Sequence, residues 1–163
     1  MKIYLASPLG FAESTRAYMD VLRERLSVHV DVVNPWDSDE FADDLRRAAL
    51  IEHREERLAL FRSINDAIGR ANADNIRASD GVVAVLDGVD IDSGTAAEIG
   101  FAYALGKWIA GLRTDFRQTG ENEAAVVNLQ VRHFIDASGG TVVTTIADLE
   151  ALVEAWASEI GTG

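Results

Sequence analysis

Four acidic side chains gather within one short stretch of the sequence. They are Asp87, Asp90, Asp92 and Glu98. Carboxylates act as nucleophiles and as proton donors or acceptors when a fold holds them beside a substrate. A loop that only turned the chain would gain nothing from so much repulsion between like charges. The density of acid therefore indicates an active site, with Asp92 and Glu98 as its central residues.

The segments on either side of these acids suggest how they are positioned. Residues 81–86 form a short, valine-rich apolar run of the kind found in buried parallel strands. Residues 96–105 are alanine-rich and end at Gly106, which predicts a helix with a glycine stop. Open α/β sheets bind ligands where a strand, a loop and a helix follow one another in this way. We therefore expect Asp92 in the loop and Glu98 in the first helical turn, where the helix dipole favours an ionised carboxylate.

A purely structural interpretation of the same stretch stays open. Thr95 and Glu98 have the spacing of a capping box, in which two side chains satisfy backbone N–H groups at the start of a helix. Gly88, Gly94 and the aspartates are also residues that turns commonly require. Asp92 by itself fits a turn-forming or helix-capping aspartate.

The segment DSGTAAEIGFA, residues 92–102, and the Gly106–Lys107 pair after it resemble the signature of the nucleoside 2-deoxyribosyltransferases. The resemblance extends over about residues 4–140 and is densest around this motif. It implies an enzyme that exchanges nucleobases on 2-deoxyribose, as in nucleotide salvage, with Ser93 and Gly94 among the residues that bind the substrate.

Within that resemblance, Glu98 is the expected nucleophile and Asp92 the group that contacts the base. Transfer at an anomeric carbon passes through an oxocarbenium-like state, which a carboxylate stabilises or traps. A covalent glycosyl-glutamate ester divides one displacement into two, so that one sugar can pass from one base to another. A departing base also needs a proton or a hydrogen bond on its ring nitrogen, and this is the role expected of Asp92.

Two other site residues, Tyr4 and Asn72, follow from the same resemblance. Tyr4 matches a tyrosine of the first strand whose hydroxyl positions the catalytic carboxylate, although a core tyrosine would look the same. Asn72 stands where some members carry a second base-contacting aspartate. An amide cannot carry a proton between groups as a carboxylate does, and a solvated helix face explains Asn72 and the nearby Asp74 equally well.

Phe11 and Trp36 follow neighbouring strands and could stack on a nucleobase, while each singly is more often a core residue.

Asn128 and Gln130 suggest that the site is shared between subunits. Asn128 resembles a family asparagine that reaches the sugar 5′-hydroxyl from a neighbouring subunit, and Gln130 replaces the methionine usual nearby. The resemblance thus implies a homo-oligomer, a dimer or a multiple of dimers, with shared active sites. An exposed helical asparagine is the alternative.

The composition predicts a soluble cytoplasmic protein. The 163 residues are 48% hydrophobic and 26% charged, which fits one domain over residues 1–163. No apolar run approaches the roughly 18 residues of a transmembrane helix, and no signal peptide is evident.

The net charge of −12 argues against nucleic acid or an anionic membrane as partner. Lys2 and Lys107 are the only lysines, and an acid-rich, lysine-poor surface suggests a halophilic source.

Strand-like runs alternate with helical periodicity along the chain. We expect strands at residues 2–6, 30–36, 81–86, 108–112 and 141–145. We expect helices at residues 12–26, 41–77 with a break near 52–53, 96–105, 124–137 and 146–160. This alternation predicts an α/β fold, a flavodoxin-like three-layer sandwich with a five-stranded parallel sheet in the order 2-1-3-4-5. The loops at residues 7–11 and 87–98 would then face each other across one crevice.

The expected chemistry needs no metal and no organic cofactor. The three histidines are scattered without metal-ligand spacing, and cysteine is absent. The expected substrates are a (deoxy)nucleoside and a free nucleobase. Two alternatives remain: an N-glycoside hydrolase of nucleosides or nucleoside 5′-monophosphates, and a non-catalytic nucleotide-binding sensor on the same fold.

Overall fold

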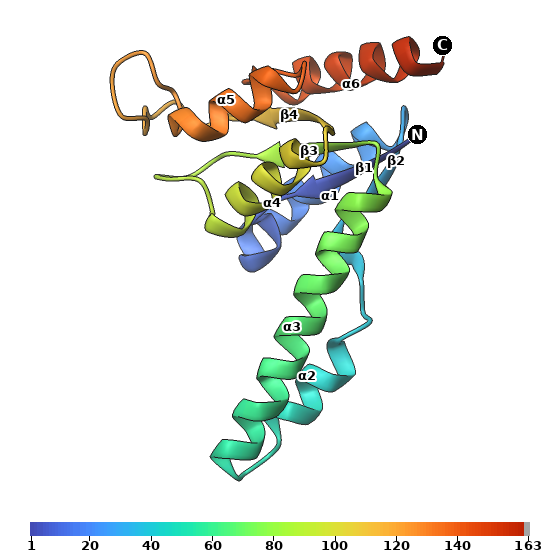
Figure 1. Ribbon diagram of the computed structural model, residues 1–163, viewed down its shortest axis with the longest axis vertical. Coiled ribbons are helices and arrows are strands. Elements are labelled where there is room, and N and C mark those ends of the chain that lie inside the picture. The colour runs from blue at the N-terminus through green and yellow to red at the C-terminus, as the bar shows by residue number, and fades with distance from the viewer. Residues whose placement is uncertain (162–163) are drawn as a thin grey trace.

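The computed structural model describes residues 1–161 and contains one parallel sheet of five strands (Figure 1). The strands are β1 (Lys2–Ala6), β2 (Asp31–Val33), β3 (Gly81–Val85), β4 (Trp108–Leu112) and β5 (Val142–Val143). Their order is β2-β1-β3-β4-β5, as predicted, which confirms the flavodoxin-like α/β architecture. Since every pair is parallel, the carboxyl ends of all the strands lie at one edge of the sheet.

Within residues 1–161, six α-helices and two short 3₁₀-helices accompany these strands, and all except α6, which follows β5, lie between strands. The α-helices are α1 (Glu13–Leu26), α2 (Ala42–Ala49), α3 (Arg54–Ala78), α4 (Ser93–Ala104), α5 (Leu129–Ala137) and α6 (Ile146–Gly161), and the 3₁₀-helices are η1 (Leu9–Phe11) and η2 (Pro35–Asp37). Within residues 1–161 no helix is long and apolar enough to cross a membrane.

The sheet is buried on both faces because its strands are apolar at successive positions. One face, with Ile3 and Leu5 of β1, packs against α1 and α6. The other face, with Tyr4 and Ala6, packs against α3, α4 and α5. Side chains alternate between the faces with the period of two of a strand, and this produces three layers. Tyr4 therefore points toward the helix that carries Glu98.

Helix α3 is much longer than the strands that it covers. Its carboxyl-terminal part packs on the sheet through Ile76, while its amino-terminal part projects past the carboxyl edge with α2 beside it (Figure 1). The 25 residues span about 38 Å at 1.5 Å per residue. The predicted break lies between Ala49 and Arg54, and the helix continues through Gly69 without interruption. The projecting pair of helices, α2 and the first half of α3, forms an arm beside the carboxyl edge of the sheet.

Three predicted elements are shorter in the structure. Strand β2 ends at Val33 because Asn34 caps η2, its side-chain oxygen accepting the Trp36 N–H. Helix α5 begins only at Leu129, after its cap residue Asn128, and β5 is a two-residue strand. The predicted glycine stop is correct, because Gly106 follows α4 with φ +69°.

Candidate active site

A pocket of about 460 Å³ lies at the carboxyl edge of the sheet, between α4 and the arm. It adjoins the position where β1 and β3 are neighbours and their connections diverge to opposite sides, which is the usual ligand site of such sheets. Apolar side chains from η2, α2 and α3 form much of its wall. Its polar side chains are Ser7, Ser38, Glu40, Asn72, Asn75, Asp92, Thr95 and Glu98.

Helix α4 begins earlier than predicted, and this changes the position of Glu98. Asp92 is the N-cap residue, and its carboxylate accepts the Thr95 N–H at 3.0 Å. Glu98 consequently lies in the second turn, so the prediction of a first-turn glutamate is wrong, and so is the capping box between Thr95 and Glu98. The steps of three from Asp92 to Thr95 to Glu98 place all three side chains on one side of the helix. That side faces the pocket.

Tyr4 holds the carboxylate of Glu98 from the sheet below. The Tyr4 side chain is fully buried, and its hydroxyl donates a hydrogen bond to Glu98 Oε1 at 2.6 Å. Burial, reinforced by the nearby carboxylate, raises the pKa of Tyr4 above its ordinary range, so the phenol stays protonated and acts as donor. One oxygen of Glu98 is thus engaged, which leaves the other available to a ligand.

The environment of Glu98 favours a basic carboxylate. Burial raises the pKa of Glu98, and the negative charge of Asp92 raises it further, whereas the hydrogen bond from Tyr4 opposes both effects. The net direction is upward from the ordinary value of 4.5. A half-buried carboxylate of raised pKa binds protons and carbon electrophiles more strongly than an exposed one.

Aromatic side chains form the wall of the pocket that follows β1 and β2. Trp36 Nε1 donates to the carbonyl oxygen of Ser7 at 2.8 Å, and its ring meets that of Phe11 edge to face, with centroids 4.5 Å apart. Gly10 permits this packing, since a Cβ at that position would lie 2.0 Å from the Trp36 ring. Phe11 is 74% exposed and belongs to neither core cluster. Both rings line the pocket, where they are open to a planar ligand.

Two side-chain amides of α3 face the pocket. Asn72, identified from the sequence, is joined by Asn75 one turn later, which sequence reasoning missed although the spacing of three residues would have found it. Asp74 points away and pairs with Arg77. Among residues 1–161 neither amide has a protein hydrogen-bond partner.

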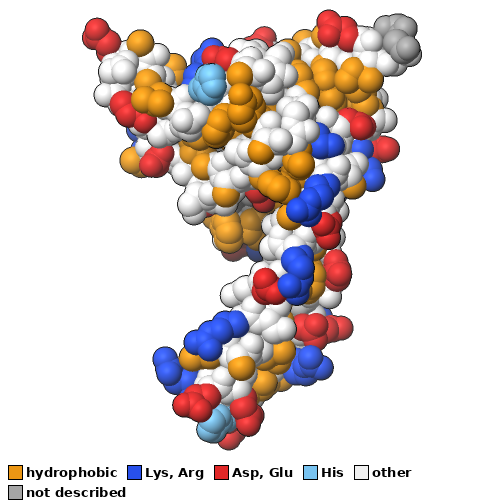
Figure 2. All heavy atoms as spheres, viewed as in Figure 1, with side chains coloured by type: hydrophobic (Ala, Val, Ile, Leu, Met, Phe, Trp, Pro, Cys, Tyr) orange, Lys and Arg blue, Asp and Glu red, His pale blue; other side chains and the backbone are white. Residues whose placement is uncertain are grey.

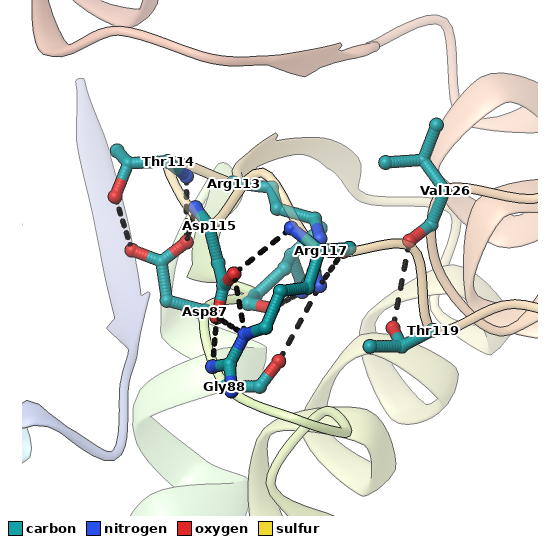
Figure 3. A network of polar contacts seen from close by, with 9 residues as sticks. Asp87, Gly88, Arg113, Thr114, Asp115, Arg117, Thr119 and Val126 are labelled. Carbon is teal, nitrogen blue, oxygen red and sulfur yellow. Dashed lines mark hydrogen bonds and ion pairs between the residues drawn. The ribbon is translucent and has the colours of Figure 1, made fainter.

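A polar network fixes the loop between β3 and α4 (Figure 3). The carboxylate of Asp87 accepts hydrogen bonds from the backbone N–H groups of Thr114 and Asp115 and from the Thr114 hydroxyl, at 2.6–2.8 Å. Arg113, only 1% exposed, donates to the carbonyl oxygens of Leu86, Gly88 and Arg117. These bonds tie the loop after β3 to the loop after β4.

Half of the acidic cluster is therefore structural. Asp87 anchors the network, and Asp90 accepts a hydrogen bond from the Ile91 N–H; neither lines the pocket. The argument from acid density holds only for Asp92 and Glu98. The role of Arg113 was missed, because an arginine directly after an apolar strand gives no local sign that it will be buried.

The family model for nucleoside 2-deoxyribosyltransferase matches residues 3–130. The chain belongs to this family. A comparison with curated proteins gave no match. Among solved structures, a conserved protein from Enterococcus faecalis V583 is similar at 29% identity and a TM-score of 0.66, with 95% of this chain and 98% of that chain covered.

Two further structures share the deoxyribosyltransferase fold. One is a 2-deoxyribosyltransferase from Bacillus psychrosaccharolyticus, with 24% identity, a TM-score of 0.55, and coverage of 92% of this chain and 90% of that chain. The other is a CMP N-glycosidase from Clostridium botulinum, with 19% identity, a TM-score of 0.55, and coverage of 96% and 99%. The fold thus occurs in both a transferase and an N-glycosidase.

Four of the predicted site residues of this deoxyribosyltransferase-family chain do not line the pocket: Tyr4, which reaches it through its bond to Glu98, and Ser93, Asn128 and Gln130. Asn128 caps α5: its side-chain oxygen accepts the N–H groups of Gln130 and Val131, and its Nδ2 donates to Glu121 at 2.8 Å. Gln130 is exposed on the first turn of α5, and Ser93 is exposed at the start of α4. Gly94 does line the pocket. Within residues 1–161 no group of three or more metal-binding side chains is close enough to hold a metal ion.

Proposed function

We propose that this protein is a nucleoside 2-deoxyribosyltransferase that exchanges nucleobases through a covalent glycosyl-Glu98 intermediate. The observation that carries the proposal is the bond from the buried Tyr4 hydroxyl to Glu98 inside a pocket that also contains Asp92. A sensor has no need of a half-buried carboxylate held in this way. A double displacement needs an oriented carboxylate beside a group that can assist the base.

The two half-reactions use the same groups in opposite directions. First, the free oxygen of Glu98 attacks the anomeric carbon, the bond from that carbon to the base nitrogen breaks, and the electron pair leaves with the nitrogen. Asp92 supplies that nitrogen with a proton or a hydrogen bond. Second, a nitrogen of another base attacks the same carbon, returns its proton to Asp92, and the Glu98 carboxylate departs. Tyr4 holds the other carboxylate oxygen throughout.

The charge of the pocket favours an uncharged nucleoside as substrate. Glu40, Asp92 and Glu98 contribute three carboxylates, and none of the described residues that line the pocket is Lys or Arg. A 5′-phosphate would meet like charge without a cation to neutralise it. This supports nucleosides over nucleoside 5′-monophosphates.

The direct test supplies deoxyinosine to the purified protein with and without free adenine. Formation of deoxyadenosine is the expected result, together with a deoxyribosyl adduct on the intact protein that Glu98→Ala lacks. Hypoxanthine release alone, equal with and without adenine, would assign the hydrolase alternative. Neither product, with nucleoside binding retained, would assign the sensor.

We also propose that the enzyme is a homo-oligomer in which Asn128 completes the site of a neighbouring subunit. Asn128 is the N-cap of α5 and does not line its own pocket. Partly exposed apolar side chains gather over α4 and α5 (Figure 2). They include Phe101, Tyr103, Leu105, Leu129 and Phe134. Apolar surface of this kind suits contact with a second copy.

Mixing two inactive variants tests the shared site. Glu98→Ala and Asn128→Ala, unfolded and refolded together, should form hybrid dimers in which one site receives both defects and the other receives none. Activity should return to about a quarter of the native value for random pairing into dimers with independent sites. No recovery, with hybrids confirmed by tagged subunits, would contradict the shared site.

A further inference from the structure

Arg113 places a positive charge inside the protein, beside the loop that leads to Asp92. The residue follows β4 directly and is almost completely buried. Its guanidinium donates hydrogen bonds to the carbonyl oxygens of Leu86, Gly88 and Arg117 (Figure 3). In the part of the chain that the structure describes, its Nε–H has no hydrogen-bond partner. A buried charge with an unpaired N–H costs free energy, so stability alone does not account for an arginine at this position.

The loop before Asp92 is held at both ends. At one end the carbonyl oxygen of Gly88 accepts a hydrogen bond from Arg113, and Gly88 has φ +129°, a backbone conformation that suits glycine. At the other end Ile91 is buried in the core on the side of α4. Between them Val89 is exposed, so no packing of its own fixes the middle of the loop. The bonds from Arg113 thus help to set the direction in which the chain enters α4.

Asp92 depends on this loop more than Glu98 does. Asp92 is the N-cap of α4, so its backbone lies at the edge of the helix and follows the incoming chain. Glu98 lies inside the helix, and the Tyr4 hydroxyl holds its carboxylate from β1. We propose that Arg113 is a positioning residue, which keeps the Asp92 carboxylate in the geometry required for proton transfer to the departing base. The proposal rests on the proposed function.

Two donor nucleosides separate the contribution of Asp92 from that of Glu98. When Glu98 attacks deoxyinosine, the electron pair of the glycosidic bond leaves with hypoxanthine, which needs a proton or a hydrogen bond from Asp92. The base of 7-methyl-2′-deoxyguanosine already carries a positive charge, so the same electron pair leaves this base neutral without a proton. Attack at the anomeric carbon is common to both. Loss of a correctly placed Asp92 should therefore slow the first nucleoside and spare the second.

The experiment measures kcat/KM for each donor with free adenine as acceptor, because in a double displacement this quantity reports the first half-reaction alone. Arg113→Met removes the donors and keeps a long side chain. It should lower kcat/KM for deoxyinosine by about 10–100-fold, the order expected when a catalytic group moves by about 1 Å. The value for 7-methyl-2′-deoxyguanosine should change by less than about threefold, since its base departs without a proton.

Two control variants should leave both values unchanged. Arg117→Gln removes the exposed ion pair with Asp115 but keeps the backbone carbonyl that Arg113 contacts. Val153→Ala lowers stability through the core on the other face of the sheet, where it touches neither loop. A general loss of stability would act on both nucleosides alike, so this pair of controls isolates the effect of the loop.

A double-mutant cycle checks that Arg113 acts through Asp92. In the Asp92→Asn background, Arg113→Met should add less than about threefold to the loss with deoxyinosine, because the group that it positions can no longer transfer a proton. Arg113→Lys keeps the charge with fewer donors, so its activity should lie between the two, and it replaces Arg113→Met if that variant does not fold. Equal falls with both nucleosides, or losses that multiply in the double variant, would overturn the proposal.

Hydrogen exchange measures the positioning without reference to activity. The backbone amides of residues 88–95 should exchange faster in Arg113→Met than in wild type, while those of residues 7–11 keep their rates. Unchanged exchange at residues 88–95 would overturn the proposal. A wild type that releases the base of neither nucleoside would instead contradict the proposed function, and the exchange rates would still decide whether Arg113 holds the loop.

Discussion

The hydrogen bond from Tyr4 lowers the pKa of Glu98, against burial and the charge of Asp92, which both raise it. In the proposed mechanism only ionised Glu98 attacks, so kcat/KM should rise with pH as Glu98 loses its proton. Tyr4→Phe removes the opposing contribution while it keeps the ring. The acid limb of the pH profile should therefore move to higher pH. An acid limb at the same or a lower pH would contradict this role of Tyr4.

The raised pKa of Glu98 also has a consequence for stability. A carboxyl whose pKa is higher in the folded state than in the unfolded state stabilises the fold while it is protonated, and this contribution is lost as pH rises through the folded-state pKa. Glu98→Gln should thus have a higher melting temperature than wild type at pH 7. The difference in melting temperature should be much smaller below pH 4.5, the ordinary pKa of a glutamate carboxyl. The same variant should lose more than about 10³-fold in exchange activity. Equal melting temperatures at both pH values would contradict the burial argument.

In the proposed mechanism Asp92 has two roles, which different substitutions can separate. As the N-cap of α4 it accepts the Thr95 N–H, and its carboxylate also faces the pocket. Asp92→Asn keeps an equally good cap, so stability should change little, whereas loss of proton transfer should lower the rate by about 10²–10⁴-fold. Asp92→Ala should show a similar fall in rate. Because it also removes the helix cap, its unfolding free energy should be ~1 kcal/mol lower than that of wild type. A folded Asp92→Asn with native activity would return Asp92 to a structural role.

At the scale of elements, the site depends on contacts between segments that are distant in sequence. The aromatic wall needs the turn at η1 to approach Trp36 of η2, and Gly10 provides the space. The loop that leads to Asp92 is held by Asp87 and Arg113 through the loop after β4 (Figure 3). The pocket is thus lined by the connections that follow β1, β2 and β3, and the connection after β2 includes the arm.

Two glycine substitutions should have opposite effects. Gly10→Ala would place a Cβ 2.0 Å from the Trp36 ring and force the indole away, so it should cost about 1–3 kcal/mol of unfolding free energy and weaken nucleoside binding. Gly69→Ala adds a Cβ with no atom within 4 Å, inside α3. It should stabilise the protein by about 0.5–1 kcal/mol. Denaturant unfolding measures both, and destabilisation by Gly69→Ala would contradict the account of the arm.

At the scale of the whole molecule, the net charge of −12 sets the response to salt. Several Arg–Asp pairs on exposed helix surfaces are one turn apart, and such pairs contribute little each. Repulsion among the excess carboxylates acts over the entire surface and is screened within about 3 Å at 1 M salt. The melting temperature should therefore rise from low to about molar potassium chloride. A melting temperature that falls or stays constant would remove the argument for a halophilic source.

The sequence by itself determined the sheet and its ligand-binding edge. Buried parallel strands are continuous apolar runs, and helices of these lengths carry their own periodicity, so the order β2-β1-β3-β4-β5 could be predicted from local patterns. Glu98 and Asp92 could be identified because they lie in one continuous motif after β3. The break between α2 and α3 was also visible locally.

Only the tertiary structure decided which polar groups face the pocket. Asp92 and Thr95 are both suitable N-cap residues for α4. In the structure Asp92 is the N-cap, so the helix begins at Ser93 and Glu98 lies in its second turn. The buried Arg113 acquires its environment from the β3 loop, which its own neighbours in sequence do not specify. Periodicity is a property of a short segment, whereas burial and the identity of a hydrogen-bond partner arise only when distant segments pack together.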